Sequence, residues 1–201
     1  MVLENKLGIT DQIELSRMEE KLSKIGAKEL FDSGKLNELK PGTYESLKII
    51  HKFLFDKIYS FAGEMRKENI AKGNFRFAPL LYLEESIKKI EQMPQNTFDE
   101  IIEKYVEMNV AHPFREGNGR SLRIWLDDML KKNINKAVDW SIIDKENYLA
   151  AMINSTTDDK DIKSLIKDAL TDKIDDRELY MKGIDHSYFY EGYKEYKTSE
   201  L

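Results

Sequence analysis

Cysteine is absent from the 201 residues of this sequence. Disulfide bonds and thiolate chemistry are therefore excluded, and the composition fits a reducing compartment. With only 4 prolines and 10 glycines, the chain has no collagen-like or disordered bias. No apolar stretch is long enough to cross a membrane, and the opening MVLENKLGIT lacks the charged head and apolar run of a secretory leader. The sequence thus predicts a cytoplasmic protein without a membrane partner.

Long blocks of one charge are also missing. The 32 lysines and arginines are interleaved with 37 acidic residues, which gives a formal net charge of -5 at pH 7. A protein that follows a phosphate backbone needs a basic patch, so we expect no nucleic-acid partner. With 41% hydrophobic and 34% charged residues, the composition is typical of a globular, helix-rich domain.

Amphipathic helical spacing dominates the chain. Apolar residues recur at intervals of three and four, which predicts helices with one buried face, in the segments 11–31, 40–63, 81–93, 97–112, 121–132, 144–155 and 160–170. Residues 67–79, KENIAKGNFRFAP, instead alternate around a Gly-Asn pair and predict a short β-hairpin. We therefore expect one compact all-α unit with a single β excursion. Residues 1–181 would form its core, and residues 182–201 would add a helix and tail.

The segment HPFREGNGR, residues 112–120, does not fit an ordinary helix. Pro113 disfavours helical geometry at the residue before it, so the preceding helix should end at His112. A histidine with a pKa near ~6.5 can take a proton from a hydroxyl at neutral pH. A helix C-terminus favours the charged imidazolium, whereas a general base must be neutral. The sequence shows nothing that offsets this effect.

A glycine-rich turn follows at the start of the next helix. Backbone N–H groups at such a position form an anion pocket, here from Gly117, Asn118 and Gly119. Arg120 and Arg123 lie three residues apart and project from one side of that helix. Glu116 is placed to hold a divalent cation that bridges phosphate oxygens. The set suits phosphoryl or nucleotidyl transfer. A plain interhelical turn needs neither the histidine nor the arginines.

Residues 112–123, HPFREGNGRSLR, match the signature H-P-F-x-[D/E]-G-N-G-R-x-x-R, and on this basis the chain resembles the Fic domain family. IHKFLFDKIYSFAGEMR (50–66) resembles the family's upstream helix and KGNFRFAP (72–79) its flap. The resemblance spans roughly residues 40–195. It implies a Fic-type helical bundle with a β-hairpin flap and a C-terminal inhibitory helix, and most members transfer AMP from ATP to a hydroxyl of a target protein.

The resemblance implies a role for each residue of the motif. His112 would deprotonate a Ser, Thr or Tyr of the target, and Glu116 would hold Mg2+ on the α- and β-phosphates. Arg120 would lie on the β-phosphate side and Arg123 would engage the γ-phosphate. Phe114 would be a buried anchor. The anion nest would be formed by Gly117, Asn118 and Gly119, the last of which is lysine in relatives that phosphorylate. We also expect Tyr148 to line the adenine side of the pocket.

The flap and the tail carry two further expectations. In the family the flap pairs its backbone with an extended segment of the target, here through Gly73, Asn74, Phe75, Arg76 and Phe77. The alternative is that the two phenylalanines only cover the core.

Near the C-terminus, SYFYEG (187–192) resembles the family's inhibitory motif [S/T]-x-x-x-E-[G/N], completed by Gly192. Ser187 would cap the helix, and Glu191 would form a bidentate pair with Arg123 that blocks productive ATP binding. Tyr188 and Tyr190 flank the glutamate and are candidates for self-modification.

Two alternatives remain. A bifunctional enzyme would also remove AMP, with Glu191 orienting water. A non-catalytic regulator would only bind nucleotide, for instance as part of a toxin–antitoxin pair, but then His112 and Glu116 would not be needed. An exposed helix face could support a homo-oligomer. His51 is interpreted as a packing or capping residue and His186 as a surface residue.

Overall fold

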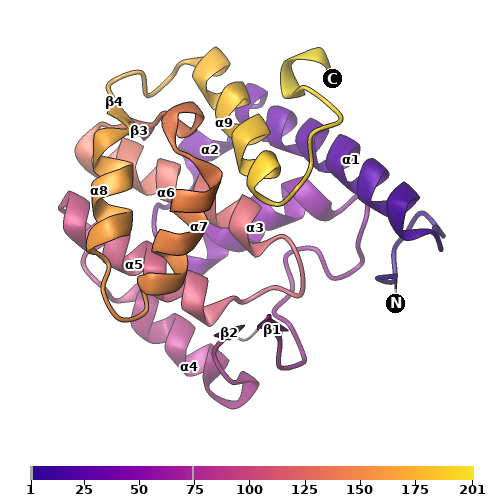
Figure 1. The fold of residues 1–201 in the computed structure, drawn as a ribbon, viewed down its shortest axis with the longest axis horizontal. Coiled ribbons are helices and arrows are strands. Elements are labelled where there is room, and N and C mark those ends of the chain that lie inside the picture. Colours follow the sequence, from indigo (N-terminus) through magenta and orange to yellow (C-terminus); the bar gives the residue numbers. More distant parts are fainter. Residues whose placement is uncertain (1, 74) are drawn as a thin grey trace.

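The computed structural model describes residues 2–73 and 75–201. Asn74, one of the expected flap residues, lies outside the described residues. Helices form most of the molecule (Figure 1), as α1 (Gln12–Asp32), α2 (Lys35–Glu38), α3 (Tyr44–Phe55), α4 (Leu80–Glu91), α5 (Phe98–Ala111), α6 (Asn118–Ile134), α7 (Lys145–Asn154), α8 (Lys160–Asp168), α9 (Arg177–Tyr190) and the 3-10 turns η1 (Trp140–Ile142) and η2 (Thr198–Glu200). Strands pair in two short ladders, β1 (Ala71–Lys72) with β2 (Phe75–Arg76), and β3 (Ala137–Val138) with β4 (Leu170–Thr171).

Side-chain caps fix where several helices begin. Thr43 accepts from the Ser46 amide at the start of α3, and Thr97 forms a capping box with Glu100 at the start of α5. These bonds satisfy amide groups that have no partner inside the first helical turn. The helix periods and the hairpin expected from the sequence are thus confirmed as an all-α fold with a flap. The second ladder, β3–β4, was not expected.

Helix α6 is at the centre of the bundle, between α3 and α5 on one side and α9 on the other. Its long apolar side chains are fully buried, which explains why this helix holds its position firmly; they include Leu122, Trp125, Leu126, Met129 and Leu130. The indole nitrogen of Trp125 donates to the carbonyl of Thr43 at 3.0 Å. The residues at the start of α6 are therefore carried by a well-packed element.

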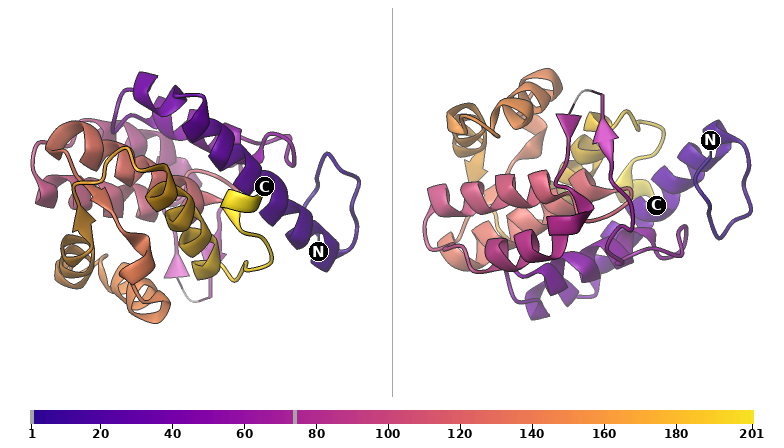
Figure 2. Two further views of the ribbon diagram at one scale, coloured as in Figure 1. Left: turned by 90° about the horizontal axis from the view of Figure 1, so that it is seen from above. Right: turned by 90° about the horizontal axis from the view of Figure 1, so that it is seen from below.

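The C-terminal segment packs against the N-terminal helix. Figure 2 shows the chain after α9 lying along α1. The amide groups of Glu195 and Tyr196 donate to the buried carboxylate of Glu20 at 3.0 and 3.1 Å. Helix α9 begins at Arg177, so the expected boundary between residues 181 and 182 falls inside a continuous helix. In the part of the chain that the structure describes, no helix is both long and apolar enough to span a bilayer.

Candidate active site

The loop between α5 and α6 is held rigid by its own side chains. His112 adopts a left-handed backbone with φ 50 and so ends α5 at the position expected from the sequence. Gly117, with φ 78, opens α6, and a side chain there would collide with the ring of Phe55. The amide side chain of Asn118 accepts from the backbone N–H of Phe114 at 2.9 Å and donates to its carbonyl at 2.8 Å. Asn118 therefore closes the loop with its side chain.

The environment of His112 keeps its imidazole neutral. The ring stacks on Phe77 of the flap with centroids 3.5 Å apart, and burial lowers the pKa of His112 to about 4. The nearby positive charges of Lys72 and Arg66 lower this pKa further. Nδ1 donates to the carbonyl of Asn109 at 3.2 Å, since a carbonyl can only accept. The tautomer that follows leaves Nε2 as a proton acceptor, and burial offsets the helix-terminus effect.

Arg66 fixes the backbone around that histidine. Its buried guanidinium donates to the carbonyl oxygens of His112 at 2.9 Å and Glu68 at 2.6 Å, and also to that of Ala78. A further contact reaches the carbonyl of Ala111 at 3.3 Å. One arginine thus ties both ends of the flap to the end of α5. No pattern in the sequence predicts this role, because the partners are all backbone atoms.

The carboxylate of Glu191 lies over the expected anion pocket. A Cβ added at Gly119 would be 2.6 Å from Glu191 Oε1, so the absence of a side chain there makes room for the carboxylate. Oε1 accepts from Arg123 Nη2 at 3.1 Å, whereas Oε2 pairs with Lys72 of the flap at 3.3 Å. The predicted contact between Glu191 and Arg123 is present. The prediction that this pair is bidentate is wrong, because Oε1 contacts Arg123 whereas Oε2 contacts Lys72. Burial alone would raise the pKa of Glu191; Arg123 first, and then Lys72 and Arg120, lower it to about 2.

Arg123 is held from two sides. Its Nε donates to Ser187 Oγ at 2.6 Å and its Nη2 to the Ser187 carbonyl at 2.9 Å. Nη1 lies 3.4 Å from the hydroxyl of Tyr148, which is buried and stacked on Tyr190. The expectation that Ser187 caps the helix is wrong, because α9 is capped by Asp176 and Ser187 lies in its last turns. In this structure Tyr148 supports Arg123.

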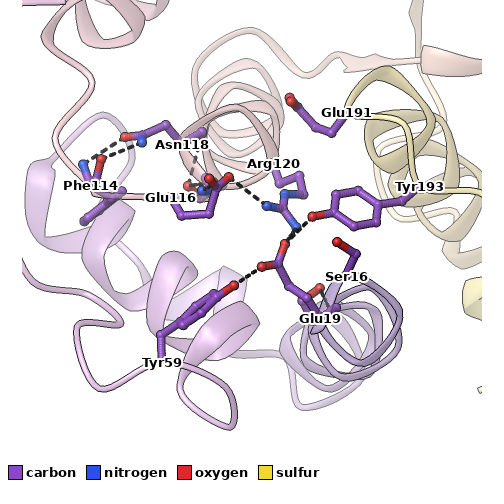
Figure 3. Close-up of polar contacts among 12 residues, drawn as sticks. Ser16, Glu19, Tyr59, Phe114, Glu116, Asn118, Arg120, Glu191 and Tyr193 are labelled. Atoms are coloured by element: carbon purple, nitrogen blue, oxygen red, sulfur yellow. Dashed lines mark hydrogen bonds and ion pairs between the residues drawn. The ribbon is translucent and has the colours of Figure 1, made fainter. Parts of the chain in front are cut away.

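Arg120 points away from Arg123, toward helix α1. Figure 3 shows its guanidinium between two carboxylates, with Nη1 donating to Glu19 Oε1 at 2.6 Å and Nη2 to Glu116 Oε1 at 3.1 Å. Both Arg120 and Glu19 are buried. Glu19 was not predicted as a site residue, since a glutamate in an amphipathic helix is usually solvated.

Comparison with known proteins identifies the family. Residues 41–130 match the model of the Fic/DOC family. The chain belongs to this family. "Protein adenylyltransferase VbhT" of Bartonella schoenbuchensis is 34% identical over 185 residues, which cover 85% of this chain but only 37% of that protein. "Probable protein adenylyltransferase y4lH" of Sinorhizobium fredii is 28% identical, over 79% of this chain and 85% of that protein.

Solved Fic structures share the fold. The Bartonella tribocorum BepC protein with bound AMPPNP matches at a TM-score of 0.68 and 21% identity, over 85% of this chain and 93% of that one. The N-terminal Fic domain of a Bartonella quintana effector with bound ADP matches at the same TM-score and 23% identity, over 85% of this chain and 91% of that one. At these identities the likeness establishes the helical Fic architecture.

Glu116, at the end of the Fic loop, is half-exposed. Its Oε1 accepts from the Gly117 amide at 2.9 Å as well as from Arg120, which leaves Oε2 for another ligand. Over residues 2–73 and 75–201, no three acidic or histidine side chains come together as a metal site. Mg2+ commonly takes one or two carboxylates and completes its shell with water and phosphate oxygens. A single Glu116 fits an ion of this kind that is bound together with a nucleotide.

The Fic flap forms as expected, with Ala71 opposite Arg76 and Lys72 opposite Phe75. Phe77 covers the ring of His112, and Phe75 meets Phe77 edge-on with centroids 5.0 Å apart. Both phenylalanines are half-buried, whereas Gly73 and Arg76 are exposed. Figure 2 shows the hairpin projecting from the helical body.

The two tyrosines beside Glu191 are not accessible. Tyr188 is fully buried under Arg120, and the hydroxyl of Tyr190 lies 2.9 Å from the carbonyl of Ile143. The expectation of self-modification is therefore contradicted for this conformation, since neither hydroxyl can reach a second molecule. Gly192 has φ 97, a backbone conformation that favours glycine, and it ends the helix just after Glu191.

Proposed function

We propose that this protein is a protein adenylyltransferase that transfers AMP from ATP to a Ser, Thr or Tyr hydroxyl of a target protein. The observation that carries the proposal is the pairing of a neutral, half-buried His112 with an anion pocket at the start of the next helix. The printed names of the relatives support it, as do the nucleotides bound in related Fic structures. The chain spans about a third of the length of VbhT.

Each residue of the site has a separate role in the proposed reaction. The target hydroxyl attacks the α-phosphorus of ATP, the bond from that phosphorus to the bridging oxygen breaks, and pyrophosphate leaves. The hydroxyl proton passes to Nε2 of His112. Backbone N–H groups at the start of α6 and the guanidinium of Arg123 hold the phosphates. A bound Mg2+, held by Glu116 and phosphate oxygens, would neutralise phosphate charge. The flap would position the target by strand addition.

We further propose that Glu191 inhibits the enzyme. Its carboxylate, ionised and half-buried, lies where a phosphate would meet Arg123 and Gly119. Two anions cannot share one arginine and one pocket without repulsion. ATP would then bind only with its terminal phosphate displaced, which misplaces the α-phosphorus.

Replacing Glu191 by glycine tests both proposals. With labelled ATP and Mg2+, we expect Glu191→Gly to raise label transfer to protein at least about tenfold, the gain from removing a competing charge contact of about 1.4 kcal/mol or more. Glu195→Gly is a matched control, because among the described residues the side chain of this tail glutamate pairs with the exposed Arg17 alone. The gain must vanish in the Glu191→Gly/His112→Ala double variant. An unchanged rate in Glu191→Gly would reject inhibition, and transfer that does not need His112 would reject the mechanism.

Removal of AMP is the second candidate function. Glu191 is ionised and close to the phosphate site, which favours its use in orienting a water molecule. AMP release from a modified target should then be lost in Glu191→Gly. A regulator that only binds nucleotide is disfavoured by a histidine kept neutral with Nε2 free. The cytoplasmic location and a homo-oligomer stay predictions.

A further inference from the structure

A carboxylate from outside the signature loop reaches the anion site. Glu19 lies on α1, outside residues 41–130, and is 3% exposed. It accepts hydrogen bonds from three segments of the chain (Figure 3): from Arg120 Nη1 at 2.6 Å, from the Tyr193 hydroxyl at 2.7 Å and from the Tyr59 hydroxyl. A buried carboxylate with this many donors stays ionised and fixed in place.

The guanidinium of Arg120 has little freedom to move. Its carbon lies 4.8 to 5.2 Å from the ring centroids of Phe55, Tyr188 and Tyr193. These faces hold the cation in one plane, and Glu19 sets its rotation within that plane. In this orientation Nη2 meets Glu116 Oε1 at 3.1 Å.

The contacts form a chain from α1 to the loop. Glu19 fixes Arg120, and Arg120 together with the Gly117 amide engages one oxygen of Glu116. With Oε1 engaged in this way, Oε2 of Glu116 is the oxygen available to a cation. Partners behind a metal ligand orient it and change metal affinity by roughly 10- to 100-fold when they are lost.

We propose that Glu19 is a positioning residue for adenylyl transfer, which acts from α1 through Arg120 on the metal-binding carboxylate of Glu116. This inference rests on the proposed function, because it names a residue that prepares that same site. It predicts that removing the charge of Glu19 weakens the increase in nucleotide affinity that Mg2+ provides. This effect is separate from any change in folding stability.

Glu20 supplies a matched control on the same helix. It is 2% exposed and pairs with Lys24 at 3.0 Å and with tail amide groups, but not with Arg120. Glu19→Gln and Glu20→Gln therefore make the same substitution at equal burial. Both are made in the Glu191→Gly background, so that loosening of the inhibitory tail cannot change the result.

Three quantities are measured: the melting temperature, the Mg2+ concentration for half-maximal label transfer, and the affinity for a fluorescent non-hydrolysable ATP analogue with Mg2+ or with EDTA. We expect Glu19→Gln to raise the half-maximal Mg2+ concentration about tenfold and to lose most of the tightening that Mg2+ gives to analogue binding. Glu20→Gln should lower the melting temperature yet leave both Mg2+ effects unchanged. Equal Mg2+ effects in the two variants, or none in Glu19→Gln, would overturn the proposal.

A second variant keeps the proposal testable if Glu19→Gln does not fold. Tyr59→Phe/Tyr193→Phe removes the two hydroxyls that orient Glu19 and keeps both charges, so it should shift the Mg2+ dependence in the same direction by less. No shift there would also overturn the proposal. If the Glu191→Gly parent transfers no label at all, the proposed function fails, while analogue binding with Mg2+ against EDTA still tests Glu19.

Discussion

Burial sets the protonation state of the proposed base. Desolvation is the largest cause that lowers the pKa of His112, followed among the lowering causes by Lys72 and Arg66, whereas the Asn109 carbonyl and Glu191 raise it. A neutral imidazole is thus present throughout the physiological range, although such a base is weaker than one with a pKa near neutrality.

The pH profile of the released enzyme tests this assignment. For Glu191→Gly we expect the acid limb of kcat/KM for label transfer to fall nearer pH 4 than pH 6.5, because the histidine is buried and the variant also lacks one group that raises its pKa. Initial rates between about pH 4.5 and about pH 8 measure it. A limb near pH 6.5 would contradict the assignment, because kcat/KM reports the free enzyme and the imidazole would then be solvated there.

At this scale, the residues predicted correctly are those whose role follows from neighbours in the chain. Pro113 predicts that α5 ends at His112, and the glycines of the loop predict a turn at the start of the next helix. Glu19 and Arg66 could not be found this way. Their partners come from distant segments or from backbone atoms, and neither leaves a pattern in a single sequence.

The flap and the C-terminal helix meet at one ion pair. Lys72 of β1 reaches Glu191 Oε2 at 3.3 Å, so the proposed docking element touches the proposed inhibitory one. The lysine side chain is 74% exposed, and exposed pairs typically contribute ~0.2–1 kcal/mol. This contact would therefore add to the proposed inhibition by Glu191 without being its main source.

Removing that pair should release the enzyme only slightly. We expect Lys72→Met to raise label transfer by about two- to fivefold in the otherwise unchanged protein, because Arg123 and Ser187 still hold the helix. Lys67→Met is the control, since Lys67 is 88% exposed and its one ion pair within residues 2–73 and 75–201 is with Glu64 at 3.6 Å. The gain should disappear in the Glu191→Gly background. A gain that persists there would show that Lys72 acts on the target or on the nucleotide instead.

Helices and strands could be predicted where apolar periodicity or a turn motif marks them in the sequence. They were harder to predict where tertiary packing determines the local structure. The flap and the helix centres follow from apolar spacing and from the Gly-Asn turn. Ser187 was misread as a cap, because its hydroxyl accepts from Arg123 inside a helix that starts at Arg177. The β3–β4 ladder has two residues in each strand, too few for any alternation to appear.

In the molecule as a whole, buried ionisable groups determine how stability responds to acid. Burial lowers the pKa of both His51 and His112 to about 4. His51 is structural: a ring nitrogen meets the Glu116 carbonyl at 2.8 Å and Nδ1 accepts from the Gly63 amide at 2.9 Å. Burial also raises the pKa of Asp127 to about 7. Its oxygens accept from the Trp140 indole and the Val138 amide, which keep the rise smaller than burial alone would make it.

These groups act in opposite directions as the pH falls. Below the unfolded pKa of ~6.5 the unfolded chain binds protons at both histidines while the folded protein does not, so stability is lost down to about pH 4, by about 3 kcal/mol for each histidine. Asp127 is protonated in the folded protein before the unfolded one, so it adds about 4 kcal/mol as the pH falls from about 7 to about 4. The histidines together exceed Asp127, and net stability should fall.

Single substitutions separate the two effects. Relative to the parent, Asp127→Asn should steepen the loss of unfolding free energy between about pH 7.5 and about pH 5, because the opposing group is gone. His112→Gln should make the loss shallower, because one of the two histidines that resist protonation is gone. Urea denaturation followed by circular dichroism at each pH gives both slopes. If unfolding free energy changed with pH equally in the parent and in both variants, Asp127 and His112 would be solvated in the folded protein. The anion site beside His112 would then be open to water as well.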